Sequence, residues 1–409
     1  MNGASGRRGD AVRDERDLVR TLRAAAVQME HRDLAAGVAR RRRARRTKQR
    51  VRMVLAAAAV VAVVAGTAAI VSRSEDHRRA EPATVLHGWD SIKSAAELWP
   101  RAVVKVPAYD SEGWRTQVAT SMSATEVLLL AKSKKERRLE VYDSARGAIR
   151  ILGSIPEGQD LRYVAVGTQY IAWYTGPLLG GPVAFWIMPR AGGAARRVGE
   201  AAHDIESFGI TEDVLVWSVR EGGGIYRMPV TGGPPQLLPG TAGLRLTSWP
   251  WAAGMSTRDV QNRVVNLETG ESIEVSLPDG VGVLQCHPEW CAGGQGERVI
   301  VQRVDGSERH TLPQELGHMG SSRMGLLGDR YAIFRALDEP MKRGVPLAIV
   351  YDFETGVMAK LGERPFAAGD GMVGYGYSTS PSTMRFWWTG DKVEDAKEYI
   401  VLNVAAMPR

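Results

Sequence analysis

The sequence lacks the short motifs that mark many enzyme families. It contains no G-x-S-x-G nucleophile motif, no H-E-x-x-H zinc motif, no Walker phosphate loop and no G-x-G-x-x-G dinucleotide motif directly after a strand. Cysteine is also scarce, with 2 among 409 residues, so no second cysteine cluster exists to complete a tetrahedral zinc site. We therefore expect a protein that is not an enzyme and that uses no cofactor or metal.

Positive charge is abundant only at the N-terminal end. The chain carries 53 Lys and Arg against 46 Asp and Glu, a net charge of +7. Residues 1–52 hold 16 basic and 6 acidic residues, which leaves 37 basic and 40 acidic residues in the remainder. The larger part of the chain is thus near neutral. The sequence gives no reason to expect nucleic acid as a partner of the main domain.

A run of 19 uncharged residues, 53–71, follows the basic segment and consists mostly of Ala and Val. As a helix it would be roughly 28 Å long, about the thickness of the hydrocarbon layer of a membrane. Basic residues remain on the cytoplasmic side of membrane helices. We therefore predict a single transmembrane helix with a cytoplasmic N-terminus and the C-terminal portion outside the cytoplasm. A cleaved signal peptide is the alternative. The predicted inner-face anchor is Arg40, Arg41, Arg42, Arg43, Arg45 and Arg46.

The predicted cytoplasmic segment, 1–52, contains apolar residues near helical spacing with charges between them. They are Leu18, Val19, Leu22, Ala26 and Met29. One amphipathic helix of this size cannot bury its own apolar face. It docks on a partner, lies on the inner leaflet of the cytoplasmic membrane or stays loosely ordered, and the sequence leaves these three alternatives open.

Beyond a polar linker over 72–84, the chain repeats one pattern: a strand rich in β-branched and aromatic residues, a short glycine turn and another strand. The spacing between successive turn glycines is 45, 40, 38, 36 and 50 residues. Four strands about every 40 residues is the period of a β-propeller blade. The turn glycines are Gly147, Gly192, Gly232, Gly270, Gly306 and Gly356.

These repeats predict an all-β fold, a single β-propeller of about seven four-stranded blades over 85–409. A ring of six or eight blades, a pair of β-sandwiches and two small barrels are the alternatives. The C-terminal strand at Glu398–Val404 looks like a third strand without a fourth, and Arg101–Pro107 looks like an outer strand without partners. We expect these two segments to pair, because that pairing would complete the last blade and close the ring.

The two cysteines, Cys286 and Cys291, flank four residues that resemble the turn of a hairpin. Outside the cytoplasm this spacing suits a local disulfide, which would contribute about 2 kcal/mol to stability. Free thiols are one alternative. A metal site that includes His287 and Glu289 is another, but adjacent ligands on so short a turn rarely converge on one ion.

Most tryptophans fall within the predicted strands, so we expect Trp173, Trp186, Trp217, Trp387 and Trp388 to pack between blades. The segment Ser-Trp-Pro-Trp at 248–251 is less tied to a strand. Its Trp249 and Trp251 are therefore our candidates for ligand contact at an entrance.

The histidines His203, His310 and His318 are scattered among the blades and could meet only through the fold. The sequence therefore identifies no catalytic residue.

The arrangement as a whole resembles actinobacterial single-pass membrane proteins that carry a TolB-like, WD-repeat-like propeller outside the membrane and a short basic segment inside. The similarity rests on the arginine-rich and Ala-Val anchor, LWPRAVVKVP at Leu98–Pro107, the CHPEWC hairpin and the blade ending VQRVDGSERHTL. In layout it also resembles membrane anti-sigma factors, which implies a sigma factor or other regulator as a cytoplasmic partner. The zinc-type signature of those proteins is absent, because no cysteine follows His31 in this segment.

We accordingly expect an extracytoplasmic binding or sensor propeller, anchored in the cell membrane. Its ligand would be an envelope protein, a peptide or a glycan. The alternative is a propeller hydrolase or lyase that acts on envelope polysaccharide. Acidic and histidine side chains gathered at one mouth of the ring would favour the enzyme, and an uncharged mouth would count against it.

Overall fold

The computed structural model describes residues 91–408, apart from 158–160, 178–180, 203, 221–222, 258, 297, 313–323, 335–345, 364–383 and 389–392. The chain divides into two units, Met1–Arg79 and Ala80–Arg409, and all described residues belong to the second. The predicted cytoplasmic segment, transmembrane helix and linker lie outside the described residues and stay predictions. Within the described part of the chain, no helix is long and apolar enough to span a membrane.

The described residues form seven antiparallel sheets, six of them with four strands in chain order. Blade 1 contains β2 (Arg115–Ser121), β3 (Glu126–Lys132), β4 (Arg137–Asp143) and β5 (Ala148–Ile155), and blade 2 contains β6 (Leu161–Val166), β7 (Tyr170–Thr175), β8 (Val183–Pro189) and β9 (Arg196–Ala201). Blade 3 contains β10 (Ile205–Ile210), β11 (Val214–Val219), β12 (Ile225–Pro229) and β13 (Gln236–Leu237), and blade 4 contains β14 (Leu244–Ser248), β15 (Trp251–Met255), β16 (Gln261–Asn266) and β17 (Ser272–Glu274). Blade 5 contains β18 (Val281–Cys286), β19 (Trp290–Gln295), β20 (Arg298–Arg303) and β21 (His310–Thr311), and blade 6 contains β22 (Met324–Leu327), β23 (Tyr331–Phe334), β24 (Pro346–Asp352) and β25 (Met358–Glu363).

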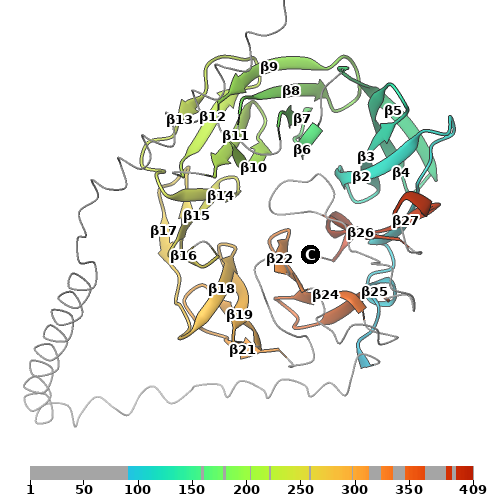
Figure 1. Cartoon of the computed structure of the whole chain (residues 1–409). Helices are drawn as coiled ribbons and strands as arrows, with labels where there is room; N and C mark the ends of the chain where they lie inside the picture. The colour runs from blue at the N-terminus through green and yellow to red at the C-terminus, as the bar shows by residue number, and fades with distance from the viewer. Residues whose placement is uncertain are drawn as a thin grey trace, which may run out of the picture. The chain divides into compact units, whose positions relative to one another are not determined.

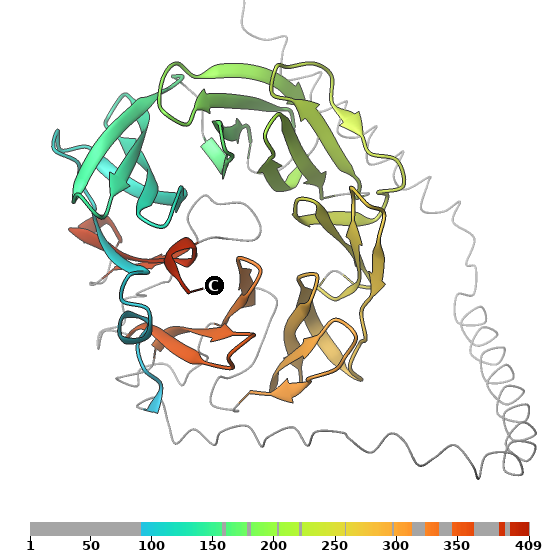
Figure 2. The same ribbon diagram turned by 180° about the vertical axis from the view of Figure 1, so that it is seen from behind.

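The sheets follow one another around a ring, with the first strand of each blade nearest the centre and the fourth at the rim (Figures 1 and 2). First strands of neighbouring blades contact each other, as β6 does with β2 and β10. The seven-bladed propeller predicted from the repeats is therefore confirmed.

The ring closes between the two ends of the described chain. Blade 7 contains β26 (Met384–Trp387), β27 (Glu398–Asn403) and β1 (Val103–Pro107), in the order β1-β27-β26. Strand β1 pairs with β27 in a register that places Val103 opposite Leu402 and Pro107 opposite Glu398. The predicted pairing of these two segments is confirmed, and an N-terminal strand thus completes the C-terminal blade.

Short helical segments border the closing blade. Helix α3 (Ala95–Leu98) contacts β25, and Ser94 and Glu97 form a capping box at its N-terminus. The 3-10 turns η4 (Val393–Asp395) and η5 (Val404–Ala406) precede and follow β27. This arrangement attaches both ends of the described chain to the last two blades.

The turn glycines behave as the sequence predicts. All six have a positive φ, between +66° and +105°. Gly192 shows why glycine is needed there for a second reason: a Cβ atom would lie 2.8 Å from the backbone carbonyl oxygen of Leu152 in the preceding blade. The turn of blade 2 therefore approaches blade 1 more closely than a side chain would permit.

The core consists of seven separate apolar clusters, one at each junction between neighbouring blades within the described part of the chain. Trp173 and Trp217 are fully buried at the junctions of blades 1–2 and 2–3, and Trp387 and Trp388 are buried at the two junctions of blade 7. Trp186 is half-buried at the first of these junctions. The prediction that these tryptophans pack between blades agrees with their positions.

The direction of each strand determines on which of the two faces of the ring a connecting turn lies. Because the strands of a blade alternate in direction, the turns joining strands one to two and three to four lie on one face, which we call the turn face. The turns joining strands two to three and the links between blades lie on the opposite face. Residues far apart in the sequence are therefore brought together on each face.

Candidate functional site

A pocket of about 500 Å³ lies on the turn face over three consecutive blades, and we call it the turn pocket. Blade 4 contributes the turn between β14 and β15, blade 5 the turn between β18 and β19, and blade 6 two turns. The lining residues are Ser248, Trp249, Pro250, Trp251, His287, Pro288, Glu289, Trp290, Asp329, Arg330 and Glu354. This volume is in the range of small-molecule sites in proteins.

His287 is the most unusual residue in the wall of the turn pocket. Its side chain is 2% exposed, and neither ring nitrogen makes a hydrogen bond to any described residue. Burial lowers the pKa of His287 to about 4, against the opposing attraction of Asp329. The imidazole is therefore neutral near pH 7, with one nitrogen able to donate and the other able to accept.

Asp329 lies beside this imidazole at the opening of the turn pocket. Its Oδ1 atom is 3.7 Å from His287 Nδ1, beyond hydrogen-bonding distance, and its side chain is 81% exposed. The carboxylate of Asp329 thus remains accessible from solvent. It does not hold the imidazole by a direct hydrogen bond.

The cation of the turn pocket, Arg330, is neutralised by its own blade. Its guanidinium donates to both carboxylate oxygens of Asp352, at 2.7 and 2.6 Å, and contacts Glu354 Oε2 at 2.7 Å. Burial acts to raise the pKa of Asp352, but the hydrogen bonds from Arg330 and Thr355 and from the Glu354 amide hold it below its ordinary value. Arg330 is therefore a fixed part of the wall.

The aromatic residues of the turn pocket differ in their contacts and in their exposure. Trp249 and Trp251 are half-buried, and the Trp249 indole N–H donates to Glu268 Oε1 at 2.9 Å. Trp290 is buried against Phe353, and the Arg303 guanidinium lies 4.2 Å from its ring centroid. Trp249 and Trp251 thus offer partly exposed apolar surface, whereas Trp290 is structural.

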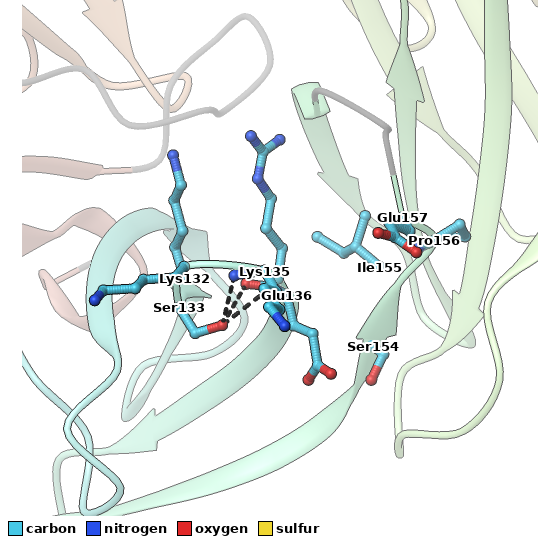
Figure 3. A pocket seen from close by; sticks show the side chains of 10 residues that line it. Lys132, Ser133, Lys135, Glu136, Ser154, Ile155, Pro156 and Glu157 are labelled. Carbon is cyan, nitrogen blue, oxygen red and sulfur yellow. Dashed lines mark hydrogen bonds between the residues drawn. The ribbon is translucent and has the colours of Figure 1, made fainter.

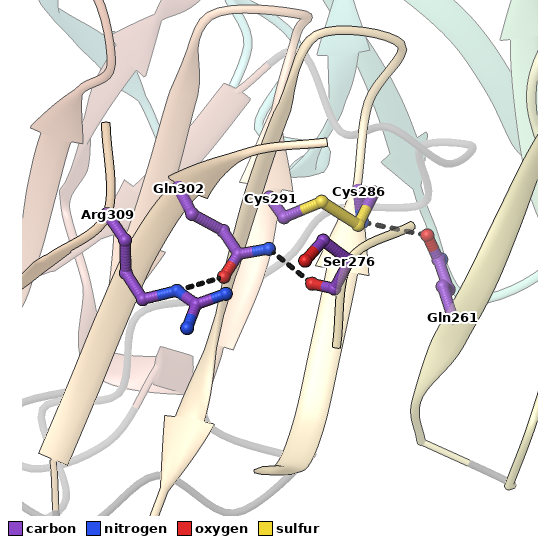
Figure 4. The surroundings of a disulfide bond; sticks show 6 residues. All are labelled: Gln261, Ser276, Cys286, Cys291, Gln302 and Arg309. Carbon is purple, nitrogen blue, oxygen red and sulfur yellow. Dashed lines mark hydrogen bonds between the residues drawn. A yellow bond between two sulfur atoms is a disulfide. The ribbon is translucent and has the colours of Figure 1, made fainter. Parts of the chain in front are cut away.

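The predicted disulfide between Cys286 and Cys291 is present and holds the blade 5 turn that lines the turn pocket (Figure 4). Because the two sulfurs are bonded to each other, neither cysteine is a free thiol or available to a metal, and both are fully buried. The backbone N–H of Cys286 also donates to Gln261 Oε1 of blade 4, at 2.7 Å. All four residues between the cysteines line the turn pocket, so the disulfide and this interblade bond fix one of its walls.

A second pocket, of about 770 Å³, lies on the opposite face between the β3–β4 turn of blade 1 and the end of β5, and we call it the lysine pocket (Figure 3). Its basic lining residues are Lys132, Lys134, Lys135 and Arg137, and its acidic ones are Glu136 and Glu157. The Ser133 hydroxyl accepts from the backbone N–H groups of Lys135 and Glu136, which shapes the turn. The lysines are exposed and well solvated.

A buried ionic cluster also lies on this opposite face, where the chain passes from blade 7 to blade 1. The Arg138 guanidinium contacts the carboxylates of Asp110, Glu112 and Glu140 and lies 4.0 Å from the ring centroid of Trp114. Burial raises the pKa of Glu140 to about 7, against the effect of Arg138 and aided by Asp110. The cluster joins the link between the blades to β4 and is structural.

The residues considered from the sequence lie in different parts of the chain. Trp249 and Trp251 lie in the turn pocket, and their contact with a ligand stays a prediction. His310 contacts the Tyr351 hydroxyl at 3.1 Å, away from the turn pocket, while His203 and His318 lie outside the described residues. The partner-helix candidates and the anchor arginines also lie outside them. Within the described part of the chain, no three His, Cys, Asp or Glu side chains are arranged to hold a metal.

From the sequence alone, His287 is a candidate only as a metal ligand, and Asp329 and Arg330 are not candidates at all. The local signal for His287 is its position in a turn closed by two cysteines. No local signal marks Asp329, because its place beside His287 depends on how blade 6 packs against blade 5.

No protein-family model and no curated protein matches this sequence. Solved structures with a similar fold include oligogalacturonate lyase from Vibrio parahaemolyticus, at 11% identity over 74% of this chain and 92% of that one, with a TM-score of 0.46. Others are a putative TolB from Agrobacterium tumefaciens (15% identity, 68% and 100% covered, TM-score 0.36) and an uncharacterized protein from Listeria monocytogenes (8%, 68% and 90%, 0.45). Similarities at this level carry no argument about activity or partners.

Proposed function

We propose that this chain is a non-enzymatic binding propeller, tethered to the cell membrane with its ring outside the cytoplasm, and that the turn pocket receives its ligand. The observation that supports the pocket as the site is the buried His287, whose two ring nitrogens lack hydrogen bonds to the described residues. A buried polar group without partners lowers stability, and a ligand that supplies those partners would remove this cost. The tether rests on the uncharged run at 53–71 and its arginine flank.

The ligand test uses thermal unfolding of the full chain with a panel of peptides and saccharides, because a ligand bound to the folded state raises the unfolding temperature. A matched pair of variants locates the site. Trp251→Leu alters the turn pocket, whereas Trp186→Leu replaces another half-buried tryptophan, in blade 2. We expect at least one ligand to stabilise the wild type and Trp186→Leu but not Trp251→Leu. Ligands that stabilise all three proteins equally would contradict the site.

We also propose that the chain relays ligand binding to a cytoplasmic regulator that the segment 1–52 binds. If its amphipathic helix binds a sigma factor or another regulator, the full chain purified from its native membranes should retain that protein. Replacing Leu18 and Leu22 together by Glu should abolish the retention, because it places charges on the apolar face. Equal capture by both proteins would refute a partner at this helix.

An enzyme is the second candidate, because one mouth of the ring carries the grouping that would favour it. His287 lies there with the carboxylates of Glu289, Asp329 and Glu354. Proton transfer by His287 would be the chemistry to test, on polysaccharide and peptide substrates incubated with the full chain. Product formation that His287→Gln abolishes would replace the binding proposal by a hydrolase or lyase. Intact substrates that nevertheless bind would support the binding proposal.

A further inference from the structure

The hydrogen-bonding needs of His287 restrict the chemistry of the ligand, if the turn pocket is the binding site as proposed above. A neutral imidazole has one donor nitrogen and one acceptor nitrogen. Both are buried in the wall of the turn pocket, without a hydrogen bond to any described residue. The two nitrogens point away from each other across the ring, so a ligand that satisfies both must present a donor on one side and an acceptor on the other. A hydroxyl can fill either role, so a ligand with several hydroxyls can supply both partners.

The distance between His287 and Asp329 points to the same group. The 3.7 Å between Nδ1 and Oδ1 is too long for a direct hydrogen bond. A ligand oxygen at about 2.8 Å from each atom would contact both. Nδ1 is closed to solvent in this structure, so the exposed Asp329 side chain must shift to admit that oxygen. A hydroxyl placed there accepts from the imidazole or donates to it, and donates to the carboxylate where its proton is free. Adjacent hydroxyls of one ligand would serve both groups together.

The charges of the turn pocket exclude an anionic ligand. Its lining contains three carboxylates, Glu289, Asp329 and Glu354, and one guanidinium, Arg330. Arg330 is already held by Asp352 and Glu354, and Glu289 is paired with Arg303 at 2.9 Å. The remaining accessible charge, on Asp329, is negative. A carboxylate or phosphate group would therefore be repelled.

A purely cationic or purely apolar ligand fits less well. An ammonium or guanidinium group only donates, so it can satisfy the acceptor nitrogen of His287 but leaves the donor without a partner. An apolar ligand leaves both without partners. The half-buried rings of Trp249 and Trp251 add apolar surface, which suits the C–H faces of a ring that carries its hydroxyls at the edge.

We propose that the turn pocket binds a neutral saccharide, with a hydroxyl bridging His287 and Asp329 and the sugar ring against Trp249 and Trp251. The cavity of about 500 Å³ accommodates one or two sugar rings. The disulfide-bonded turn of blade 5 holds His287 in position before the ligand arrives. Recognition thus depends on groups from blades 4, 5 and 6 and not on any single repeat.

The test is titration calorimetry of the full chain with neutral trisaccharides of glucose, mannose and N-acetylglucosamine, with trigalacturonate as the anionic probe and trilysine as the cationic one. The variants are His287→Leu and Asp329→Asn. The matched control is Asp213→Asn, which alters an exposed aspartate in the corresponding turn of blade 3. Because Asp329 is exposed, Asp329→Asn keeps the test usable if a substitution at the buried His287 disturbs folding.

We expect a neutral trisaccharide to bind most tightly, and His287→Leu and Asp329→Asn each to weaken it about ten-fold or more, with Asp213→Asn unchanged. If trigalacturonate or trilysine binds most tightly and the same two variants weaken it, the saccharide class is wrong but the binding site stands. If a trisaccharide binds equally to all variants, the assigned contacts are wrong. If no probe of any class binds, both this inference and the proposed binding function fail.

Discussion

Replacement of the buried His287 by Leu gives a direct energetic test of its unusual environment. The change removes two polar nitrogens that lack hydrogen bonds to the described residues and puts an apolar side chain of similar size in their place. A buried unsatisfied polar group costs roughly 1–3 kcal/mol. We therefore expect the variant to be more stable than the wild type at pH 7.5 by an amount in that range. Most substitutions of a fully buried side chain have the opposite sign.

The pH dependence provides the second part of the same prediction. Burial lowers the pKa of His287 from 6.5 in the unfolded chain to about 4 in the folded protein. Between pH 6.5 and 4 the unfolded chain binds a proton at His287 that the folded protein does not bind. The free energy of unfolding is therefore undiminished above pH 6.5 and falls as the pH drops towards 4. At about 1.4 kcal/mol per pH unit the loss approaches about 3 kcal/mol. The Leu variant has no such loss, so its advantage should widen on acidification.

Urea unfolding, followed by tryptophan fluorescence at pH 7.5, 6 and 4.5, measures both effects. His310→Leu is the matched control, because His310 is hydrogen-bonded to Tyr351 at 3.1 Å. That variant should be less stable than the wild type at pH 7.5. A destabilised His287→Leu protein, or one whose acid dependence equals that of the wild type, would refute the account of His287.

Three further predictions concern stability elsewhere in the ring. Glu140→Gln should flatten the pH dependence of the unfolding free energy. Because the pKa of Glu140 is raised to about 7, the stability contributed by the wild-type carboxyl is present below about pH 4.5 and is lost as the pH rises to 7. The variant should therefore gain stability relative to the wild type at pH 8, and unchanged urea midpoints across this range would contradict the shift. Replacing Cys286 and Cys291 together by Ser should lower the free energy of unfolding by about 2 kcal/mol, and stability equal to the wild type in urea would show that the disulfide contributes nothing. Gly293→Ala should lower the free energy of unfolding by about 1–3 kcal/mol, because its Cβ would lie 2.2 Å from a carbonyl oxygen of β18. Gly282→Ala should be tolerated, because its Cβ would have no atom within 4 Å. Equal thermal shifts for the two variants would refute the packing of this hairpin.

The fold could be predicted from the sequence because its determinants are local and repeated. Each turn glycine, such as Gly147, marks a position where the backbone requires a positive φ, and this requirement recurs in every repeat. Closure of the ring was predictable because the C-terminal strand lacked a fourth strand and the segment near Val103 lacked partners, and the two do pair. Trp249 and Trp251 were candidates because the sequence at 248–251 is less tied to a strand pattern, although the structure places Trp251 at the start of β15.

The composition of the turn pocket could not be predicted in the same way. His287 and Asp329 belong to different blades, and their distance of 3.7 Å depends on the apolar cluster that packs blade 5 against blade 6. Burial of the imidazole likewise results from neighbours that are remote in the sequence. The repeat period gives the order of the blades, but it does not specify which turn residues meet or how their charges are paired.

The central claim is that His287 and Asp329 together bind a ligand hydroxyl in the turn pocket. A crystal structure of the full chain with the best-bound neutral trisaccharide tests it most directly. We expect a ligand oxygen within about 3 Å of a ring nitrogen of His287 and of the Asp329 carboxylate, with a sugar ring against Trp249 or Trp251. A saccharide bound on the opposite face of the ring, or in the turn pocket without a contact to His287, would contradict it.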